Sequence, residues 1–148
     1  MLRNTLAVIG VFLALTIAAA DAAEQRNATL YKNPQCGCCE EYANYLRQHG
    51  FTVKVQPTHN LSLIRKQAGV NIPEKLEGCH TMFVDKYVVD GHVPFKTLDK
   101  LLTERPDIRG ISLPGMPQGS PGMSGAKTEP FMIYEISNDA EPRVYATE

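Results

Sequence analysis

Residues 28–50, ATLYKNPQCGCCEEYANYLRQHG, decide the fold, because they combine a strand, a cysteine-rich turn and a helix. Residues 28–32 include β-branched and aromatic side chains, which predicts a short strand, and Pro34 marks its end. Aromatic and aliphatic side chains then recur at helical spacing over residues 40–49, and Gly50 suits the end of a helix. The helix is therefore expected to begin at or just before the cysteines.

Short apolar runs and helical patterns alternate along the rest of the chain. Strands are expected at residues 51–55, 81–84, 87–89 and 131–136, and helices at residues 61–68 and 96–104. A loop rich in glycine and proline, residues 114–125, precedes the last strand. The order predicts a thioredoxin-like α/β fold: a four-stranded mixed sheet with flanking helices and an additional C-terminal loop and strand.

This topology places three separate segments at one edge of the sheet. A right-handed crossover makes the first two strands parallel, and the hairpin then adds an antiparallel strand and one more. The end of the first strand, the start of the third and the end of the fourth should therefore meet. Those three places hold Cys36, Cys38 and Cys39, then Cys79 and His80, then His92.

Composition limits the classes of function. The chain has 148 residues, of which 43% are hydrophobic and 21% charged, which suits one compact domain. Its formal net charge is -1, so no basic surplus is present to neutralise phosphates. Neither nucleic acid nor an anionic membrane surface is an expected partner.

The N-terminus has the pattern of a secretory signal peptide. Arg3 precedes an apolar run, residues 6–20, that is short for a membrane span, and small residues around Ala22 suit cleavage. We therefore expect a signal peptide over residues 1–22 and a domain of thioredoxin-like fold over residues 23–148, exported to an oxidising extracytoplasmic space and without a membrane span after cleavage. An uncleaved membrane anchor is the alternative. In an oxidising compartment, cysteines are paired or occupied.

The cysteine pattern exceeds what dithiol exchange needs. Cys36 and Cys39 form a C-x-x-C pair at a helix start, where the thiolate is favoured, while Cys38 and Cys79 add further sulfurs. Adjacent Cys38 and Cys39 suit sulfurs that bridge neighbouring ions better than two corners of one tetrahedron. Because thiolates suit Cu(I), we infer a polynuclear copper site rather than a single zinc. The methionines of the glycine-proline loop, Met116 and Met123, would add thioethers if that loop folds over the edge.

Four ordered motifs carry a resemblance to a known family. They are NPQCGCC at residues 33–39, GCHT at 78–81, DGHVP at 90–94 and PGMPQGSPGM at 114–123. Together they resemble the CopG-type periplasmic copper-resistance proteins. The resemblance implies a cysteine-bridged multicopper cluster on Cys36, Cys38, Cys39 and Cys79, with His80 and His92 as adjacent candidate ligands.

That family also implies a function in copper resistance and homeostasis, with handling of the Cu(I) and Cu(II) states. A periplasmic copper carrier or efflux protein is the expected partner. The sequence favours a metal-binding protein and leaves enzyme activity undecided.

Two alternatives stay open. Four cysteines in an exported protein can form two structural disulfides. A thiol-disulfide oxidoreductase would use Cys36 as the attacking thiol and Cys39 as the resolving thiol. Such enzymes usually place a cis-proline before the third strand, where this chain has Cys79. Arsenate reductases of the same fold share the Asn-Pro-x-Cys-Gly start but keep a single cysteine there, which makes oxyanion reduction the weaker interpretation.

Overall fold

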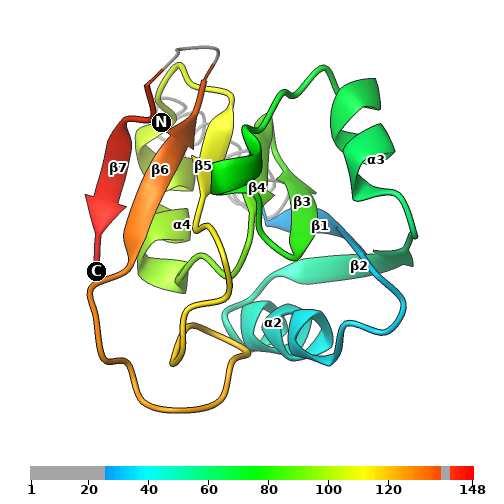
Figure 1. Ribbon diagram of the computed structural model, residues 1–148, viewed down its shortest axis with the longest axis vertical. Coiled ribbons are helices and arrows are strands. Elements are labelled where there is room, and N and C mark those ends of the chain that lie inside the picture. Colours follow the sequence, from blue (N-terminus) through cyan, green and yellow to red (C-terminus); the bar gives the residue numbers. More distant parts are fainter. Residues whose placement is uncertain (1–25, 138–140) are drawn as a thin grey trace, which may run out of the picture.

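A computed structural model of the chain describes residues 26–137 and 141–148. The expected signal peptide, residues 1–22, lies outside these described residues. The elements in chain order are β1 (Asn27–Lys32), α2 (Gly37–Gln48), β2 (Thr52–Pro57), α3 (Leu61–Gln67), the 3₁₀ turn η1 (Glu74–Leu76), β3 (His80–Val84), β4 (Tyr87–Asp90), α4 (Phe95–Glu104), β5 (Gly110–Ser112), β6 (Met132–Ile136) and β7 (Val144–Thr147) (Figure 1). Within the described part, none of the helices has the length and apolar character to cross a bilayer.

The strands form one mixed sheet, and the predicted α/β class is confirmed. β1 pairs parallel with β2 and antiparallel with β3, which forms a hairpin with β4, as the topology argument required. The sheet is nevertheless wider than predicted. The described residues give seven strands in the order β2-β1-β3-β4-β5-β6-β7 (Figure 1). The prediction of a four-stranded sheet with one additional strand therefore gave too few strands, because β5 and β7 were not anticipated.

The two unanticipated strands lack the features that identify strands in a sequence. β5 has only three residues and starts at Gly110, where a Cβ atom would lie 1.8 Å from the Val88 carbonyl oxygen. This glycine is required by the close approach of β5 to β4, not by strand propensity. β7 is four residues long, and none of them is fully buried, so it shows no alternation of buried and exposed positions.

Each face of the sheet packs against its own apolar cluster. Side chains of α2 and α4, such as Tyr42, Leu46 and Leu98, join the larger cluster on one face. On the other face, Leu76 of η1 packs in a smaller cluster with Val88. Burial of both faces is what holds the strand ends in fixed positions.

The helix α2 begins among the cysteines, as the sequence pattern predicted. It starts at Gly37, so that Cys38 and Cys39 lie in its first turn and Cys36 is its N-cap residue. The register of the sheet pairs Lys32 at the end of β1 with His80 at the start of β3. The cysteine turn and the start of β3 therefore lie at the same edge.

Candidate metal centre

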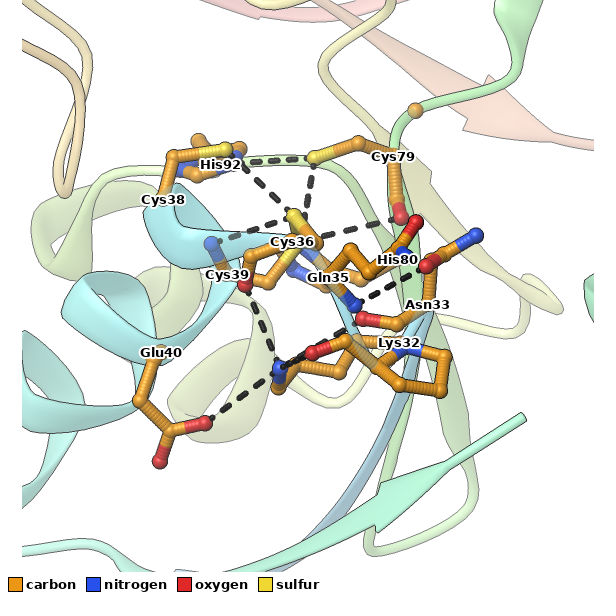
Figure 2. The surroundings of a disulfide bond; sticks show 12 residues. Lys32, Asn33, Gln35, Cys36, Cys38, Cys39, Glu40, Cys79, His80 and His92 are labelled. Carbon is orange, nitrogen blue, oxygen red and sulfur yellow. Dashed lines mark hydrogen bonds and ion pairs between the residues drawn. A yellow bond between two sulfur atoms is a disulfide. The ribbon is translucent and has the colours of Figure 1, made fainter. Parts of the chain in front are cut away.

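Four sulfur atoms meet at this edge (Figure 2). The ligand atoms of Cys36, Cys38, Cys39 and Cys79 all lie within 4.8 Å of one another. The Cys38 sulfur is 3.4 Å from that of Cys36, and the Cys79 sulfur is 3.5 Å from that of Cys39. The convergence that the strand order implied is therefore present, although Cys79 is distant in sequence.

One disulfide bond joins two of these sulfurs. Cys36 and Cys39 are bonded to each other, while Cys38 and Cys79 are free thiols. The backbone N–H of Cys39 also donates to the Cys36 sulfur over 3.3 Å, which caps the first turn of α2. The two-disulfide alternative is therefore not the arrangement of this structure. Reduction of a single bond gives four thiols in one place.

His92 presents a ring nitrogen with a lone pair to the cysteines. Its Nδ1 lies 2.6 Å from the carbonyl oxygen of Pro121, which can only accept a hydrogen bond, so we place the ring proton on Nδ1. Its Nε2 then carries a lone pair and lies 3.0 Å from the Cys79 sulfur. Burial lowers the pKa of His92, which keeps the imidazole neutral. A neutral imidazole held by a second hydrogen bond is the form in which histidine binds metals.

His80 lies deeper, and one of its nitrogen atoms is unpaired. Its ring contacts those of Tyr42 and His92, with centroid separations of 4.8 and 5.0 Å. Its Nε2 is buried without a hydrogen-bond partner among the described residues, which is unusual for a buried polar atom. Burial, followed by the nearby His92 and Arg65 side chains, lowers the pKa of His80 well below its ordinary value. The imidazole is therefore neutral, and its other ring nitrogen, Nδ1, is the one that faces the cysteines, 3.7 Å from the Cys79 sulfur.

The two histidines and two of the cysteines form a second group of candidate ligands, or donor group. It overlaps the first donor group, which consists of the four cysteines. The ligand atoms of Cys39, Cys79, His80 and His92 also lie within 4.8 Å of one another. Cys39 and Cys79 belong to both groups. The structure thus brings together all six of the candidate ligands inferred from the sequence.

The Cys79 thiol is protonated in the absence of a metal ion. Burial and the neighbouring Cys38 raise the pKa of Cys79 to about 12. The same burial that disfavours a bare thiolate favours a thiolate whose charge is balanced by a bound cation.

A buried polar network, which the sequence did not reveal, surrounds Cys79. Asp90 is fully buried and accepts hydrogen bonds from the Gly78 backbone N–H at 2.5 Å and from the Thr81 hydroxyl at 2.6 Å. Arg65 of α3 pairs with Asp90 at 3.1 Å and also donates to the Gly78 carbonyl oxygen at 3.2 Å. Burial raises the pKa of Asp90 to about 6, against the lowering effects of Arg65, Thr81 and Gly78. These contacts fix the backbone on both sides of Cys79.

The glycine-proline loop folds over the start of α2. Besides the contact from Pro121 to His92, Gly122 packs so closely that a Cβ atom would lie 2.7 Å from the Tyr42 nitrogen and 2.8 Å from the Cys38 oxygen. Met116 on the same loop is 52% exposed. The proposed thioether ligands thus belong to a loop that does reach the cysteine turn.

Comparison with known proteins supports the resemblance. A family model described as "Protein of unknown function, DUF411" matches residues 76–123. A solved structure described as "Copper resistance protein copG- Form 1" superposes with a TM-score of 0.74 at 31% sequence identity, covering 84% of this chain and 98% of that one. The corresponding Form 2 structure gives a TM-score of 0.73 at 31% identity, covering 82% of this chain and 97% of that one. The chain belongs to the CopG family. No curated protein sequence matches it.

Membership of the CopG family agrees with the order of motifs along the chain. The segment matched by the family model, residues 76–123, contains Cys79, His80 and His92 together with most of the glycine-proline loop. The similarity to CopG structures also agrees with the mixed α/β fold described above.

Proposed function

We propose that this CopG-family protein binds Cu(I) in copper resistance and homeostasis. The observation that carries the proposal is the pair of overlapping donor groups, each with its ligand atoms within 4.8 Å of one another. Thiolate sulfur is a soft ligand and imidazole suits copper, so this donor set fits Cu(I). The Nδ1 atom of His80, 3.7 Å from the Cys79 sulfur, and the Nε2 lone pair of His92 would supply the nitrogen ligands.

The shared sulfurs favour more than one copper ion. One ion held by the four cysteines and another held by the Cys39, Cys79, His80 and His92 group would both contact Cys39 and Cys79. Thiolate sulfur can bridge two metal ions, so we propose that the copper forms a cysteine-bridged multinuclear cluster.

The disulfide provides a way to handle copper in both oxidation states. Two Cu(II) ions and the Cys36 and Cys39 thiols would yield two Cu(I) ions, one disulfide bond and two protons. Cys38, Cys79 and the histidines would remain as ligands for the Cu(I) that is formed. This function suits an exported, periplasmic protein that exchanges copper with a carrier or efflux protein, and these assignments are part of the proposal.

Counting copper and thiols tests the proposal. Purified protein is reduced, freed of reductant and titrated with Cu(I) without oxygen, and the bound copper and the remaining reactive thiols are measured. We expect more than one copper per protein and no reactive thiol at saturation. A Cys38→Ser variant should retain less copper, because one of the sulfurs that bind it is lost. Uptake of no copper, or four thiols that stay reactive, would contradict the proposal.

The Cys36–Cys39 disulfide also favours a second candidate function, thiol-disulfide exchange. The backbone before β3 argues against a protein substrate, however. The Gly78 N–H and carbonyl are bonded to Asp90 and Arg65, and the Glu77 carbonyl accepts from Gly115 of the same chain. Turnover of a disulfide substrate by the Cys38→Ser variant, without tight copper binding by the wild type, would favour exchange.

A further inference from the structure

Cys79 and His92 are in contact, although they lie outside the cysteine turn on two different segments. Cys79 directly precedes β3, and His92 lies two residues after the end of β4. The Cys79 sulfur is nevertheless 3.0 Å from the His92 Nε2 atom (Figure 2). Neither residue takes part in the Cys36–Cys39 disulfide, so that bond does not account for their contact.

Each of these two residues follows a glycine, and the backbones of the two glycines cross in close contact. A Cβ atom on Gly78 would lie 2.4 Å from the Cα atom of Gly91 and 2.6 Å from its nitrogen. A Cβ atom on Gly91 would lie 2.1 Å from the carbonyl oxygen of Leu113. Atoms this close would overlap, so the crossing of the two segments requires glycine at both positions.

Hydrogen bonds hold the two segments together at the Gly78–Gly91 crossing. Asp90, the residue before Gly91, accepts the Gly78 backbone N–H at 2.5 Å. Arg65 donates to the Gly78 carbonyl oxygen at 3.2 Å and to Asp90 at 3.1 Å, so it binds both segments. The Gly91 N–H donates to the His80 carbonyl oxygen at 3.1 Å. These contacts join protein atoms to one another, so they do not depend on a bound ion.

The crossing sets the separation of Cys79 and His92, because each of them is bonded to one of the crossing glycines. A Cβ atom on Gly78 would meet backbone rather than the end of a flexible side chain, so the two segments would have to move apart. The Cys79 sulfur and the His92 nitrogen would then separate as well. Ligand atoms that are already held in place lose little freedom on binding, which favours binding.

We propose that Gly78 and Gly91 are positioning residues, which hold Cys79 against His92 before a metal ion binds and in both redox states of the disulfide. Resting on the proposed function, the inference adds that this preformed pair receives Cu(I) while Cys36 and Cys39 are still bonded to each other. The structural part of the inference, that the glycines hold the pair together, does not require copper.

Nuclear magnetic resonance of the metal-free protein tests the structural part. The readout is the nuclear Overhauser effect (NOE) between the β protons of Cys79 and the ring protons of His92, which is observed only between protons that are close in space. The variant is Gly78→Ala. Gly50→Ala is the matched control, because the φ of +84° at Gly50 also strains an alanine, but the nearest atom to its Cβ would be 3.9 Å away. Gly50 follows the end of α2 that is remote from the cysteines.

The inference predicts a specific pattern of NOEs. The wild type should show the NOE in its oxidised and in its reduced form, and Gly50→Ala should retain it even though its melting temperature falls. Gly78→Ala should lose it. If Gly78→Ala does not fold, Arg65→Lys takes its place and should weaken the NOE, because lysine keeps a positive charge beside Asp90 but lacks the fork of donors that also reaches the Gly78 carbonyl oxygen.

Three results would overturn the inference. The first is loss of the NOE when the wild-type disulfide is reduced, and the second is its loss in Gly50→Ala. The third is an unchanged NOE in Gly78→Ala or, where that variant does not fold, in Arg65→Lys.

Copper binding by the oxidised protein tests the functional part. The oxidised protein receives an equimolar amount of Cu(I) without oxygen, and a chromogenic Cu(I) chelator then competes for the metal. The wild type and Gly50→Ala should retain copper equally, while Gly78→Ala, or Arg65→Lys in its place, should release it at about tenfold lower chelator concentration.

The outcomes separate the inference from the proposed function. If neither the oxidised nor the reduced wild type takes up Cu(I), the proposed function fails, whereas the NOE still decides whether the glycines position Cys79. If the reduced wild type binds Cu(I) but the oxidised wild type does not, the inference fails alone. It also fails alone if the glycine variant retains copper as tightly as the wild type.

Discussion

Cys39 is one of two cysteines that belong to both groups of candidate copper ligands. It is fully buried in the first turn of α2, forms the disulfide with Cys36 and belongs to both donor groups. Cys38, its neighbour in sequence, belongs only to the group of four sulfurs. The two adjacent cysteines therefore differ in what their loss should do.

Substitution of the shared cysteine should be the more damaging change. We expect Cys39→Ser to weaken Cu(I) retention at least about tenfold more than Cys38→Ser, because it removes a ligand from both groups. Competition with a Cu(I) chelator, monitored by absorbance, measures the difference, and circular dichroism checks that both variants fold. Equal copper retention by the two variants would contradict a bridging role for Cys39.

Asp90 should matter for stability rather than as a ligand. Asp90→Asn leaves the buried Arg65 guanidinium with less compensating charge, which should cost about 3 kcal/mol of unfolding free energy. Asp99→Asn breaks the Arg26–Asp99 ion pair, in which both side chains are more than a third exposed, and should cost less than about 1 kcal/mol. Urea denaturation at neutral pH measures both changes. A loss for Asp90→Asn no larger than that of the control would show that the network contributes little.

At the scale of elements, the glycine-proline loop closes one side of the metal centre. The loop reaches His92 through Pro121 and reaches α2 through Gly122. Gly122 has a φ of +82°, and the backbone atoms around it leave no room for a Cβ atom. The loop is therefore held by a close backbone approach that only glycine permits.

An added methyl group should lift this loop from α2. Gly122→Ala is expected to disturb the Pro121 contact that sets the proton of His92, and so to speed loss of Cu(I) to a chelator by about tenfold. Gly115→Ala is the matched control, because Gly115 also has a positive φ, +68°, but has open space where its Cβ atom would lie. Stopped-flow absorbance of the chelator complex gives both rates. Identical rates would show that the loop does not retain the metal.

At the scale of the whole molecule, the donors come from three segments that are far apart in sequence. A ligand that binds only the folded protein stabilises it, by about 2.7 kcal/mol when its free concentration is a hundredfold above its dissociation constant. We therefore expect Cu(I) to raise the melting temperature of the reduced protein. The oxidised protein, in which the Cys36–Cys39 bond occupies two donors, should gain less. Calorimetry of both forms with and without Cu(I) tests this expectation.

The sequence predicted the parts of the fold that local patterns determine. The β1, turn and α2 unit, the β3–β4 hairpin and the meeting of Cys36 with Cys79 all follow from strand order and helix spacing. β5 and β7 were missed because a three-residue strand that begins with Gly110, and a strand without buried positions, carry no local signal. They form because the backbone of a neighbouring strand, β4 for β5 and β6 for β7, provides hydrogen-bonding partners.

The burial of Lys32 and Arg65 could not be predicted either, because it too depends on contacts that form only in the folded chain. Lysine and arginine are normally exposed, and nothing next to Lys32 or Arg65 in the sequence indicates otherwise. Arg65 is buried because β3 and β4 bring Thr81 and Asp90 under α3, and Lys32 because the turn folds its carbonyl groups back over the end of β1. Such positions depend on tertiary structure, so they require coordinates.

The two free thiols lie against opposite sulfurs of the disulfide, Cys38 beside Cys36 and Cys79 beside Cys39. A thiolate in contact with a disulfide can displace one of its sulfurs without any net oxidation. Because burial keeps Cys79 protonated, the attacking group is Cys38, which would bond to Cys36 and release Cys39. The oxidised protein would then be a pair of isomers of equal mass. After slow alkylation, peptide mapping should find two labels per molecule, one on Cys79 and the other divided between Cys38 and Cys39.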